Sequence, residues 1–509
     1  MKNYKLNKTQ FNFSDLISVS TERLGAFYET LEEATPIEYS GTETGYHIYT
    51  NLRLPLKLSA AEGVQSAKNY LKIINGYAQQ AQAFATIYGI TILELQGEVI
   101  HYFYDTPKSE DSTLRVIAFV KELHDAIKNE NGISDAPFVG TCDYGKTVFV
   151  KEGLGSSASV VSLSPAANAP AKQLGADKTP SGHIAIPSNL SDDIDVLKNI
   201  KKSQWLMVSL SEMPQSLSES MTMQFSTKEL RGDYIQQANE AFASYQAPTI
   251  LFSQEDLREY NIEGATPETP AILQGFYMRA DLDGFTKTVE TAFAQGNVAI
   301  AGLVQSFVSQ MEYANTFIET QQLKVNKIQK FPWAGDCANF LALPLESYSN
   351  AQRSLPVHLA ANWHDLCEEE SPDGGRWKDR FEDAGWAVVV AGGTDSESDD
   401  TGNSGRTLVA KIQLKDRQFL IAAGWSPGRC VDGLEAGAGK DETIIHDADK
   451  KELSQPLEKL FSELDSRFWK KRRLSKKSIE TAVAGIAMPS IINPATHRSV
   501  EPRPYYDYE

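Results

Sequence analysis

The sequence is poor in cysteine and has no long apolar run, and each absence excludes a class of protein. Its four cysteines lie far apart without a CxxC pair, which argues against a zinc ribbon or a disulfide framework and favours a reducing compartment. No apolar stretch approaches the roughly 20 residues of a membrane span, and residues 1–15 lack the apolar core of a signal peptide. We therefore expect a cytoplasmic protein that does not bind membranes.

Basic residues are also scarce relative to acidic ones, with 49 Lys and Arg against 67 Asp and Glu and a formal net charge of -18. A chain of this charge repels phosphate backbones and anionic lipid, so general affinity for nucleic acid or membrane surfaces is not expected. A local basic pocket for a nucleotide remains compatible with it. Hydrophobic residues make up 41% of the chain, which is enough to bury globular cores.

A supersecondary pattern of strand, helix and hairpin occurs twice in the 509 residues. In the first copy, a β-like segment at 45–52 precedes a long helical pattern at 59–88 and two short β runs turned at Gln96-Gly97. In the second copy, a β-like segment at 271–282 precedes a helical pattern and two β runs turned at Ala334-Gly335. Two copies of one order predict two related domains.

The segment between the copies differs in composition, since residues 166–189 are rich in Ala, Pro, Ser and Gly. We predict a first domain at 1–189, a linking subdomain at 190–265, a second domain at 266–470 and a tail at 471–509.

Candidate chemistry concentrates in the second copy, where MRADLDGFT places Asp281 near a strand end and Gly284, Phe285 and Thr286 at a helix start. Backbone N–H groups at a helix start favour phosphate oxygens, and a cation would join the carboxylate to them. The hairpin turn AGDC supplies a second carboxylate, Asp336. Two carboxylates on neighbouring strands suit a pair of Mg²⁺ ions, although isolated aspartates at such positions are usually structural.

These motifs resemble those of class III adenylate and guanylate cyclases, with Asp281-Leu-Asp-Gly-Phe-Thr286 as the metal strand and Gly335-Asp336 as the metal hairpin. The resemblance implies an α+β fold of two ferredoxin-like βαββαβ domains, packed head to tail as an intramolecular pseudo-dimer in a monomeric chain. It also implies two Mg²⁺ or Mn²⁺ ions held by Asp281, Asp336 and the backbone carbonyl of Leu282.

The first copy departs from the family pattern at its metal site. Asn51 stands where the first carboxylate belongs, Leu54-Pro55 replaces Gly-Phe, and the hairpin carries Glu98. A neutral amide does not offset the charge of a divalent ion, so this copy should hold no metal pair.

The first copy retains the other half of the family's site. Asn168 and Lys172, four residues apart on one helix face, match the Asn and Arg that hold the ribose and the reacting phosphate in the family. Lys in place of Arg exchanges a bidentate fork for a point charge, and Arg429 is a candidate helper. The second copy has Lys450 and Ser454 at the matching positions, so the two copies together predict one composite site.

The base-reading positions do not match either purine type completely. Glu94 occupies the position where adenylate cyclases have Lys and guanylate cyclases Glu, and Val161 replaces the usual polar residue seven positions before the Asn. This resembles the pyrimidine cyclases of bacterial Pycsar antiphage systems, which implies UTP or CTP as substrate and a separate effector that reads the cyclic product. A purine cyclase and a non-catalytic nucleotide-binding regulator remain alternatives.

Two glycine-containing segments are expected to be decoys. GTCDYGKT at 140–147 matches the phosphate-loop pattern, but it continues as TVFV, which predicts a strand and not the required helix. The acidic Gly-rich stretch at 392–405 would repel phosphates and is predicted to be a loop.

Overall fold

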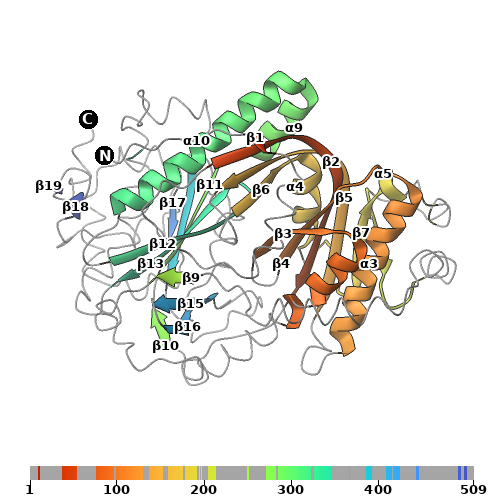
Figure 1. Cartoon of the computed structure of the whole chain (residues 1–509), viewed down its shortest axis with the longest axis horizontal. Coiled ribbons are helices and arrows are strands. Elements are labelled where there is room, and N and C mark those ends of the chain that lie inside the picture. The colour runs from red at the N-terminus through yellow and green to blue at the C-terminus, as the bar shows by residue number, and fades with distance from the viewer. Residues whose placement is uncertain are drawn as a thin grey trace.

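In the computed structural model, the described residues form three sheets and a small hairpin (Figure 1). The residues that it describes are 10–11, 37–53, 76–78, 80–96, 99–129, 137–152, 159–175, 178–191, 194, 197, 204–213, 249–251, 271–274, 276–282, 285–321, 326–344, 366, 386–392, 408–414, 417–424, 443–445, 491–493 and 498–500. Below, the first half means described residues up to 213, and the second half means those from 249 onward.

The first sheet has eight strands in the order β3-β4-β2-β5-β7-β8, with β1 paired to β2 and β6 paired to β5. The strands are β1 (Gln10–Phe11), β2 (Ile37–Leu52), β3 (Thr91–Gln96), β4 (Val99–Tyr104), β5 (Phe138–Glu152), β6 (Ser159–Leu163), β7 (His183–Pro187) and β8 (Trp205–Ser209). Strand β8 extends this sheet past residue 189, where composition had suggested a domain end.

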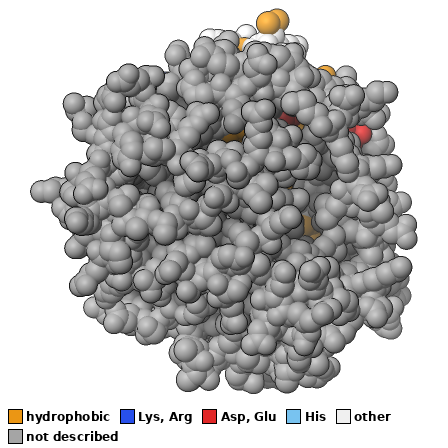
Figure 2. All heavy atoms as spheres, turned by 90° about the vertical axis from the view of Figure 1, so that its left-hand side faces the viewer, with side chains coloured by type: hydrophobic (Ala, Val, Ile, Leu, Met, Phe, Trp, Pro, Cys, Tyr) orange, Lys and Arg blue, Asp and Glu red, His pale blue; other side chains and the backbone are white. Residues whose placement is uncertain are grey.

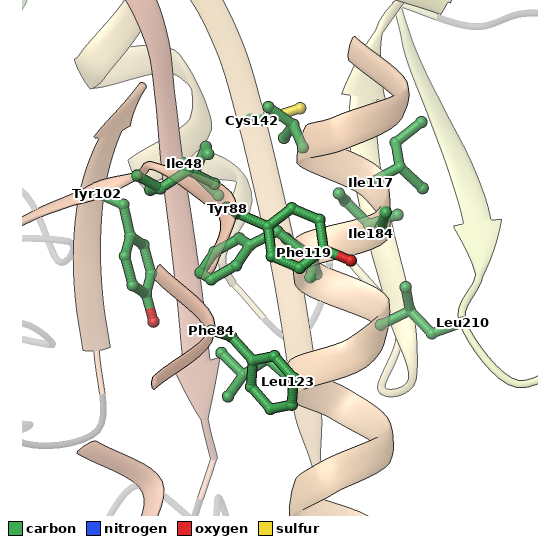
Figure 3. Close-up of a cluster of buried hydrophobic side chains, with 14 of the residues drawn as sticks. Ile48, Phe84, Tyr88, Tyr102, Ile117, Phe119, Leu123, Cys142, Ile184 and Leu210 are labelled. Carbon is green, nitrogen blue, oxygen red and sulfur yellow. The ribbon is translucent and has the colours of Figure 1, made fainter. Parts of the chain in front are cut away.

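One face of the first sheet packs against helices and forms the core of the first half (Figure 3). Alternate side chains of β2, including Tyr46 and Ile48, point to this face because side chains of a strand alternate. Opposite them, α3 (Glu110–Asn129) contributes Ile117, Phe119 and Leu123. Helical residues 80–88 add Phe84 and Tyr88. This half therefore has a hydrophobic core of its own.

The second sheet repeats the strand order of the first. Its order is β12-β13-β11-β14-β17, formed by β11 (Phe276–Leu282), β12 (Asn326–Ala334), β13 (Cys337–Pro344), β14 (Trp386–Gly392) and β17 (Thr443–Ile445). The first three contacts are antiparallel and the last is parallel, as in β3-β4-β2-β5-β7. The repeat expected from the sequence is therefore present in the topology.

The third sheet divides the β-like segment 271–282 into two strands that belong to different sheets. Its order is β10-β16-β15-β9, from β10 (Ala271–Gln274), β16 (Arg417–Gly424), β15 (Leu408–Leu414) and β9 (Thr249–Leu251). Strand β10 pairs with β16, whereas β11 pairs with β13 and β14. A separate hairpin joins β18 (Ile491–Asn493) and β19 (Arg498–Val500).

Two helices follow β11, namely α9 (Phe285–Gln295) and α10 (Asn297–Gln321). Gly296 separates them with a φ of 96°, a left-handed conformation that glycine adopts without a side-chain clash. Figure 1 shows α10 lying along the upper side of the second sheet.

The core around α9 and α10 contains residues from both halves. The second half provides Phe285, Phe307 and Trp333 among others, and the first half provides side chains of β2, β5 and β6. The first-half members are Ile37, Val148, Val150, Val161 and Leu163. We call this cluster the interface core, because neither half completes it alone.

The two glycine-containing segments that resemble phosphate-binding loops can be compared with the structure. Residues 140–147 lie within the continuous strand β5, so the phosphate-loop interpretation is excluded as expected. Of the stretch 392–405, only Gly392 is described.

No helix among the described residues is long and apolar enough to cross a membrane. Hydrophobic side chains reach the upper edge of the surface in Figure 2, and Val298 is 90% exposed.

Candidate functional site

The two predicted metal ligands lie at the same edge of the second sheet. Ala280 of β11 pairs with Ala338 of β13. Asp281 is the next residue of β11, and Asp336 lies two residues before Ala338 on the neighbouring strand. Because the two strands are antiparallel, these two backbone positions are neighbours. Leu282 ends β11 and pairs with Trp386 of β14.

Asp336 stands in a tight turn between β12 and β13 that glycine makes possible. Gly335 has a φ of 66°, in the left-handed region that disfavours other residues. Asp336 is half-buried, and Cys337 after it is buried. The Gly-Asp motif thus forms the hairpin turn that the sequence predicted.

The helix that follows β11 begins at Phe285, and Thr286 is its second residue. The ring of Phe285 is buried in the interface core, with its centroid 5.5 Å from that of Phe307. This buried ring anchors the start of α9, so Phe285 can offer a ligand its backbone N–H group but not its side chain. Gly284 lies outside the described residues.

Asn168 and Lys172 lie on α4 (Pro165–Gln173), a short helix with strong local signals. Ser164 caps its start, since its hydroxyl accepts the Ala166 N–H at 3.0 Å and donates to the Lys146 carbonyl at 2.7 Å. Pro165 occupies the first helical position, where no N–H donor is needed.

Helix α4 packs closely on the face of β5 that is opposite to α3. The Thr141 hydroxyl donates to the carbonyl of Pro170 at 3.0 Å. A Cβ atom on Gly145 would lie 2.8 Å from Cβ of Ala166, so glycine is required for this approach. The guanidinium group of Arg53 donates to the carbonyls of Leu174 and Thr179 and holds the end of the helix.

Lys172 connects the two halves of the predicted site. Its exposed ammonium group donates to the hydroxyl of Thr286, with an Nζ–Oγ1 distance of 3.0 Å. Asn168, one turn earlier on α4, is half-buried. The structure thus brings the helix carrying Asn168 and Lys172 to the first turn of α9, which directly follows the strand of Asp281.

The first sheet has an amide at the place that Asp281 occupies in the second. Asn51 pairs with Val99 of β4 and Val139 of β5, at the strand end that corresponds to Asp281. Its side chain is 7% exposed, and its Oδ1 atom has no hydrogen-bond partner. Because the Asn51 amide is neutral, it carries no negative charge that a metal ion would balance.

The same face of the first sheet carries a buried histidine pair that the sequence analysis did not single out. Nδ1 of His47 lies 3.0 Å from Nε2 of His101, and the ring of Tyr49 stacks on His101 at 4.0 Å between centroids. Burial lowers the pKa of His47 to about 3, and burial together with His47 lowers that of His101. Both imidazoles are therefore neutral near pH 7. The sequence carries a signal for this face, because His47, Tyr49 and Asn51 alternate along β2 and His101 lies opposite them on β4.

Glu94 of β3 lies beside this face. It pairs with His101 after a bulge at Leu93, and it is half-buried. Burial, and secondarily the charge of Glu94, raise the pKa of Tyr49 well above its usual value. The carboxylate of Glu94 is thus close enough to influence a ring on the polar face.

Val161 lies on β6 opposite Val150, 3% exposed, within the interface core. Its side chain packs with apolar groups, so a polar base-reading contact from this position is excluded by the chemistry of valine. Arg429, Glu98, Lys450 and Ser454 lie outside the described residues.

The donor set at the second-sheet edge fits divalent cations, because carboxylates and backbone carbonyls are hard oxygen ligands. No group of three or more His, Cys, Asp and Glu side chains able to hold a metal is found among the described residues. The predicted set contains only two such side chains, Asp281 and Asp336, and its third ligand would be a backbone carbonyl.

Comparisons with known proteins bear on the fold. No family model matches the chain. No curated protein matches it either. Its structure is similar to the crystal structure of a class III adenylyl cyclase-like ATP-binding protein from Pseudomonas aeruginosa, with a TM-score of 0.58 and 15% identity. The match covers 88% of this chain and 94% of that one.

Two solved cyclase structures show smaller overlaps. The guanylyl cyclase Cya2 matches 30% of this chain and 79% of its own, at 18% identity and a TM-score of 0.25. The adenylyl cyclase CyaB from P. aeruginosa matches 33% and 93%, at 14% identity and a TM-score of 0.25. The whole-chain similarity confirms the expected α+β, class III cyclase-like fold; the pseudo-dimeric arrangement stays a prediction.

Proposed function

We propose that the chain is a nucleotidyl cyclase, which converts a nucleoside triphosphate to its 3′,5′-cyclic monophosphate and pyrophosphate. The observation that carries this proposal is the contact of Lys172 with Thr286. It joins the helix with the substrate-orienting residues of one half to the helix that follows the metal strand of the other. The intramolecular pseudo-dimer with one composite site accounts for this contact.

In this proposal, Asp281, Asp336 and the carbonyl of Leu282 would hold two Mg²⁺ or Mn²⁺ ions. When bound, such ions would acidify the ribose 3′-hydroxyl and neutralise triphosphate charge. The backbone N–H groups at the start of α9 would donate to phosphate oxygens of the substrate.

The remaining roles fall to the first half. Asn168 would orient the ribose, and Lys172, with Arg429, would stabilise the charge on the reacting phosphate. The 3′-oxygen forms a bond to the α-phosphorus, the bond to the β-phosphate oxygen breaks, and the hydroxyl proton passes to solvent as pyrophosphate leaves.

The substrate that we favour is UTP, with CTP second, since Glu94 and Val161 complete neither purine signature. The cyclic product would then act as a second messenger for a separate effector in antiphage defence of the Pycsar type. An adenylate or guanylate cyclase is the alternative, because every argument from the metal site and from Lys172 applies equally to it.

A second candidate is a nucleotide-binding regulator without turnover. The similar protein from P. aeruginosa is described as cyclase-like and ATP-binding, which favours this candidate, and so does the eroded metal site at Asn51. Against it stand the two carboxylates of the second sheet, which a protein that only binds nucleotide does not require.

One experiment separates these candidates. The protein is incubated with ATP, GTP, CTP and UTP in turn with Mn²⁺, and cyclic products and pyrophosphate are identified by mass spectrometry. A single cyclic nucleotide would establish the activity and the base. Return of all four triphosphates unchanged, with nucleotide retained on the protein, would favour the regulator.

A further inference from the structure

A buried carboxylate of the first half holds the strand that leads to Asp336. Glu152, at the end of β5, is 3% exposed. Its Oε1 accepts the Asn315 amide at 2.7 Å and the Lys330 ammonium, and its Oε2 accepts the indole N–H of Trp333 at 2.9 Å. Asn315 belongs to α10, and Lys330 and Trp333 belong to β12. One carboxylate therefore joins two elements of the second half.

A second contact reaches the backbone of the same strand. The pairing of β12 with β13 is interrupted between Phe331 and Ala334. Pro332 has no N–H group to donate to the ladder, which suits it to such a bulge. The N–H of Trp333 instead donates to the hydroxyl of Ser159 on β6, at 3.1 Å. At the bulge, the backbone N–H of Trp333 therefore bonds to the first half of the chain and not to the neighbouring strand β13.

These contacts end three residues before Asp336. Trp333 is fully buried in the interface core, and Ala334, the last residue of β12, leads from it into the turn Gly335-Asp336. With both its indole and its backbone N–H held, Trp333 fixes where this short turn begins. A carboxylate must be held to within about half an ångström to serve a metal site, so its support matters for its chemistry.

We propose that Ser159 and Glu152 are positioning residues that set the place of the Asp336 hairpin, so that the first half of the chain controls metal binding in the second. This inference rests on the proposed cyclase function for its chemical consequence, but the structural coupling stands independently of it. Together with the Lys172–Thr286 contact, it gives the first half a hold on both segments that carry the predicted ligands.

The first test replaces Ser159 with alanine, and Ser40→Ala is the matched control. The Ser40 hydroxyl likewise accepts a backbone N–H next to a strand bulge, that of Phe149 at 2.9 Å, but within the first half. Hydrogen–deuterium exchange of peptides covering 326–344 should become about tenfold faster in Ser159→Ala, in line with the loss of one buried hydrogen bond. Ser40→Ala should leave that exchange unchanged.

The second test measures Mn²⁺ binding by the electron paramagnetic resonance of free Mn²⁺, with a non-cyclisable 3′-deoxynucleoside triphosphate present. Ser159→Ala and Glu152→Gln should weaken Mn²⁺ binding about fivefold or more, whereas Glu38→Gln should not. Glu38 forms an ion pair with Lys151 inside the first half. Glu38→Gln therefore removes a glutamate–lysine ion pair, as Glu152→Gln does, but without affecting a contact between the halves. Turnover, where present, should need correspondingly more Mn²⁺ with the nucleotide KM unchanged.

The outcomes separate the two proposals. Unchanged exchange of 326–344 in both Ser159→Ala and Glu152→Gln would overturn the positioning role, whatever the activity. Faster exchange in the variants, combined with a wild-type protein that binds no Mn²⁺ and makes no product, would retain the coupling and reject the cyclase. Because Ser159→Ala removes only one hydroxyl, it keeps the test meaningful if Glu152→Gln does not fold.

Discussion

The two sheets share one strand order, yet they differ at the second-to-last residue of the central strand. In the first sheet this residue is Asn51, buried and with an unpaired Oδ1 atom; in the second it is Asp281. Around Asn51 the first sheet carries neutral histidines and aromatic rings. One topology thus supports a face with buried neutral histidines in one half and a candidate cation site in the other, and the proposed composite site uses this difference.

The cores differ in the same sense. The core of the first half is built from described residues between 46 and 210, whereas the interface core around α9 and α10 includes β2, β5 and β6 of the first half. The second half therefore depends on the first for part of its buried apolar surface, while the described core of the first half does not depend on the second.

The largest effect is expected when the second sheet is given the residue of the first. Asp281→Asn is nearly isosteric, so the fold should persist, but the charge that a divalent ion requires is lost. Turnover should fall at least about a thousandfold, which corresponds to the several kcal/mol that such an ion contributes. Cyclic product formed per minute with Mn²⁺, quantified by mass spectrometry, measures it.

Two controls address the same comparison from the first half. Glu98→Ala should leave turnover largely intact, since no metal is expected there. Asn51→Asp should create no second site and should destabilise the protein by about 3 kcal/mol in urea, because it buries an unpaired charge. Equal losses in Asp281→Asn and Glu98→Ala would contradict the single composite site.

A steric comparison uses one glycine from each half. A Cβ atom on Gly45 would lie 2.5 Å from both the Phe103 ring and the Tyr104 carbonyl, and the carbonyl belongs to the neighbouring strand. Gly45→Ala should therefore cost about 2–3 kcal/mol of unfolding free energy. Gly302→Ala, on α10 with nothing within 4 Å, should instead stabilise by up to about 1 kcal/mol. Urea unfolding of both variants is the measurement, and a neutral Gly45→Ala would refute the close packing.

The histidine pair makes the first half sensitive to acid. The folded pKa of His47 is about 3, below the unfolded value near 6.5, so the unfolded chain takes up protons that the folded chain does not. Stability is thus full above pH 6.5 and falls as the pH drops toward 3. Asp143, the partner of His47 on β5, opposes this below about pH 6, because burial raises its pKa to about 6.

Replacing the titrating ring tests this dependence. His47→Gln keeps a neutral polar side chain that does not titrate. Between pH 7 and pH 4, the unfolding free energy of the variant, measured in urea, should decrease by about 2 kcal/mol less than that of the wild type. Parallel pH profiles for the two proteins would exclude His47 as the source of the acid sensitivity.

A smaller loss of turnover than that of Asp281→Asn is expected at the contact between the halves. Lys172→Ala should lower turnover about 30-fold through loss of a cationic donor, with little change in unfolding free energy because the side chain is exposed. Lys172→Arg should retain activity, since guanidinium matches phosphate geometry. Lys178→Ala removes a neighbouring lysine whose ammonium group donates to the backbone carbonyl of Lys172, and it should be silent in steady-state assays. A silent Lys172→Ala would remove Lys172 from the site.

Much of the local structure followed from sequence patterns. The pairing of β3 with β4, the hairpin turned at Ala334-Gly335, the α4 helix with its Asn168 to Lys172 spacing, and the strand at 147–150 all depend on neighbours in sequence. The pairing of β8 with β7, the division of 271–282 between two sheets and the burial of Val161 did not follow, since each depends on a partner far along the chain.

The sequence by itself determined which residues could do chemistry, because an aspartate at a strand end or a lysine one turn after an asparagine is fixed by the order of the chain. Only the tertiary structure decided which of them meet. Lys172 reaches Thr286, and Glu152 reaches Trp333, across more than 100 residues of sequence. Such contacts arise from the burial of apolar surface shared by the two halves, and that surface takes its shape only when both sheets have formed.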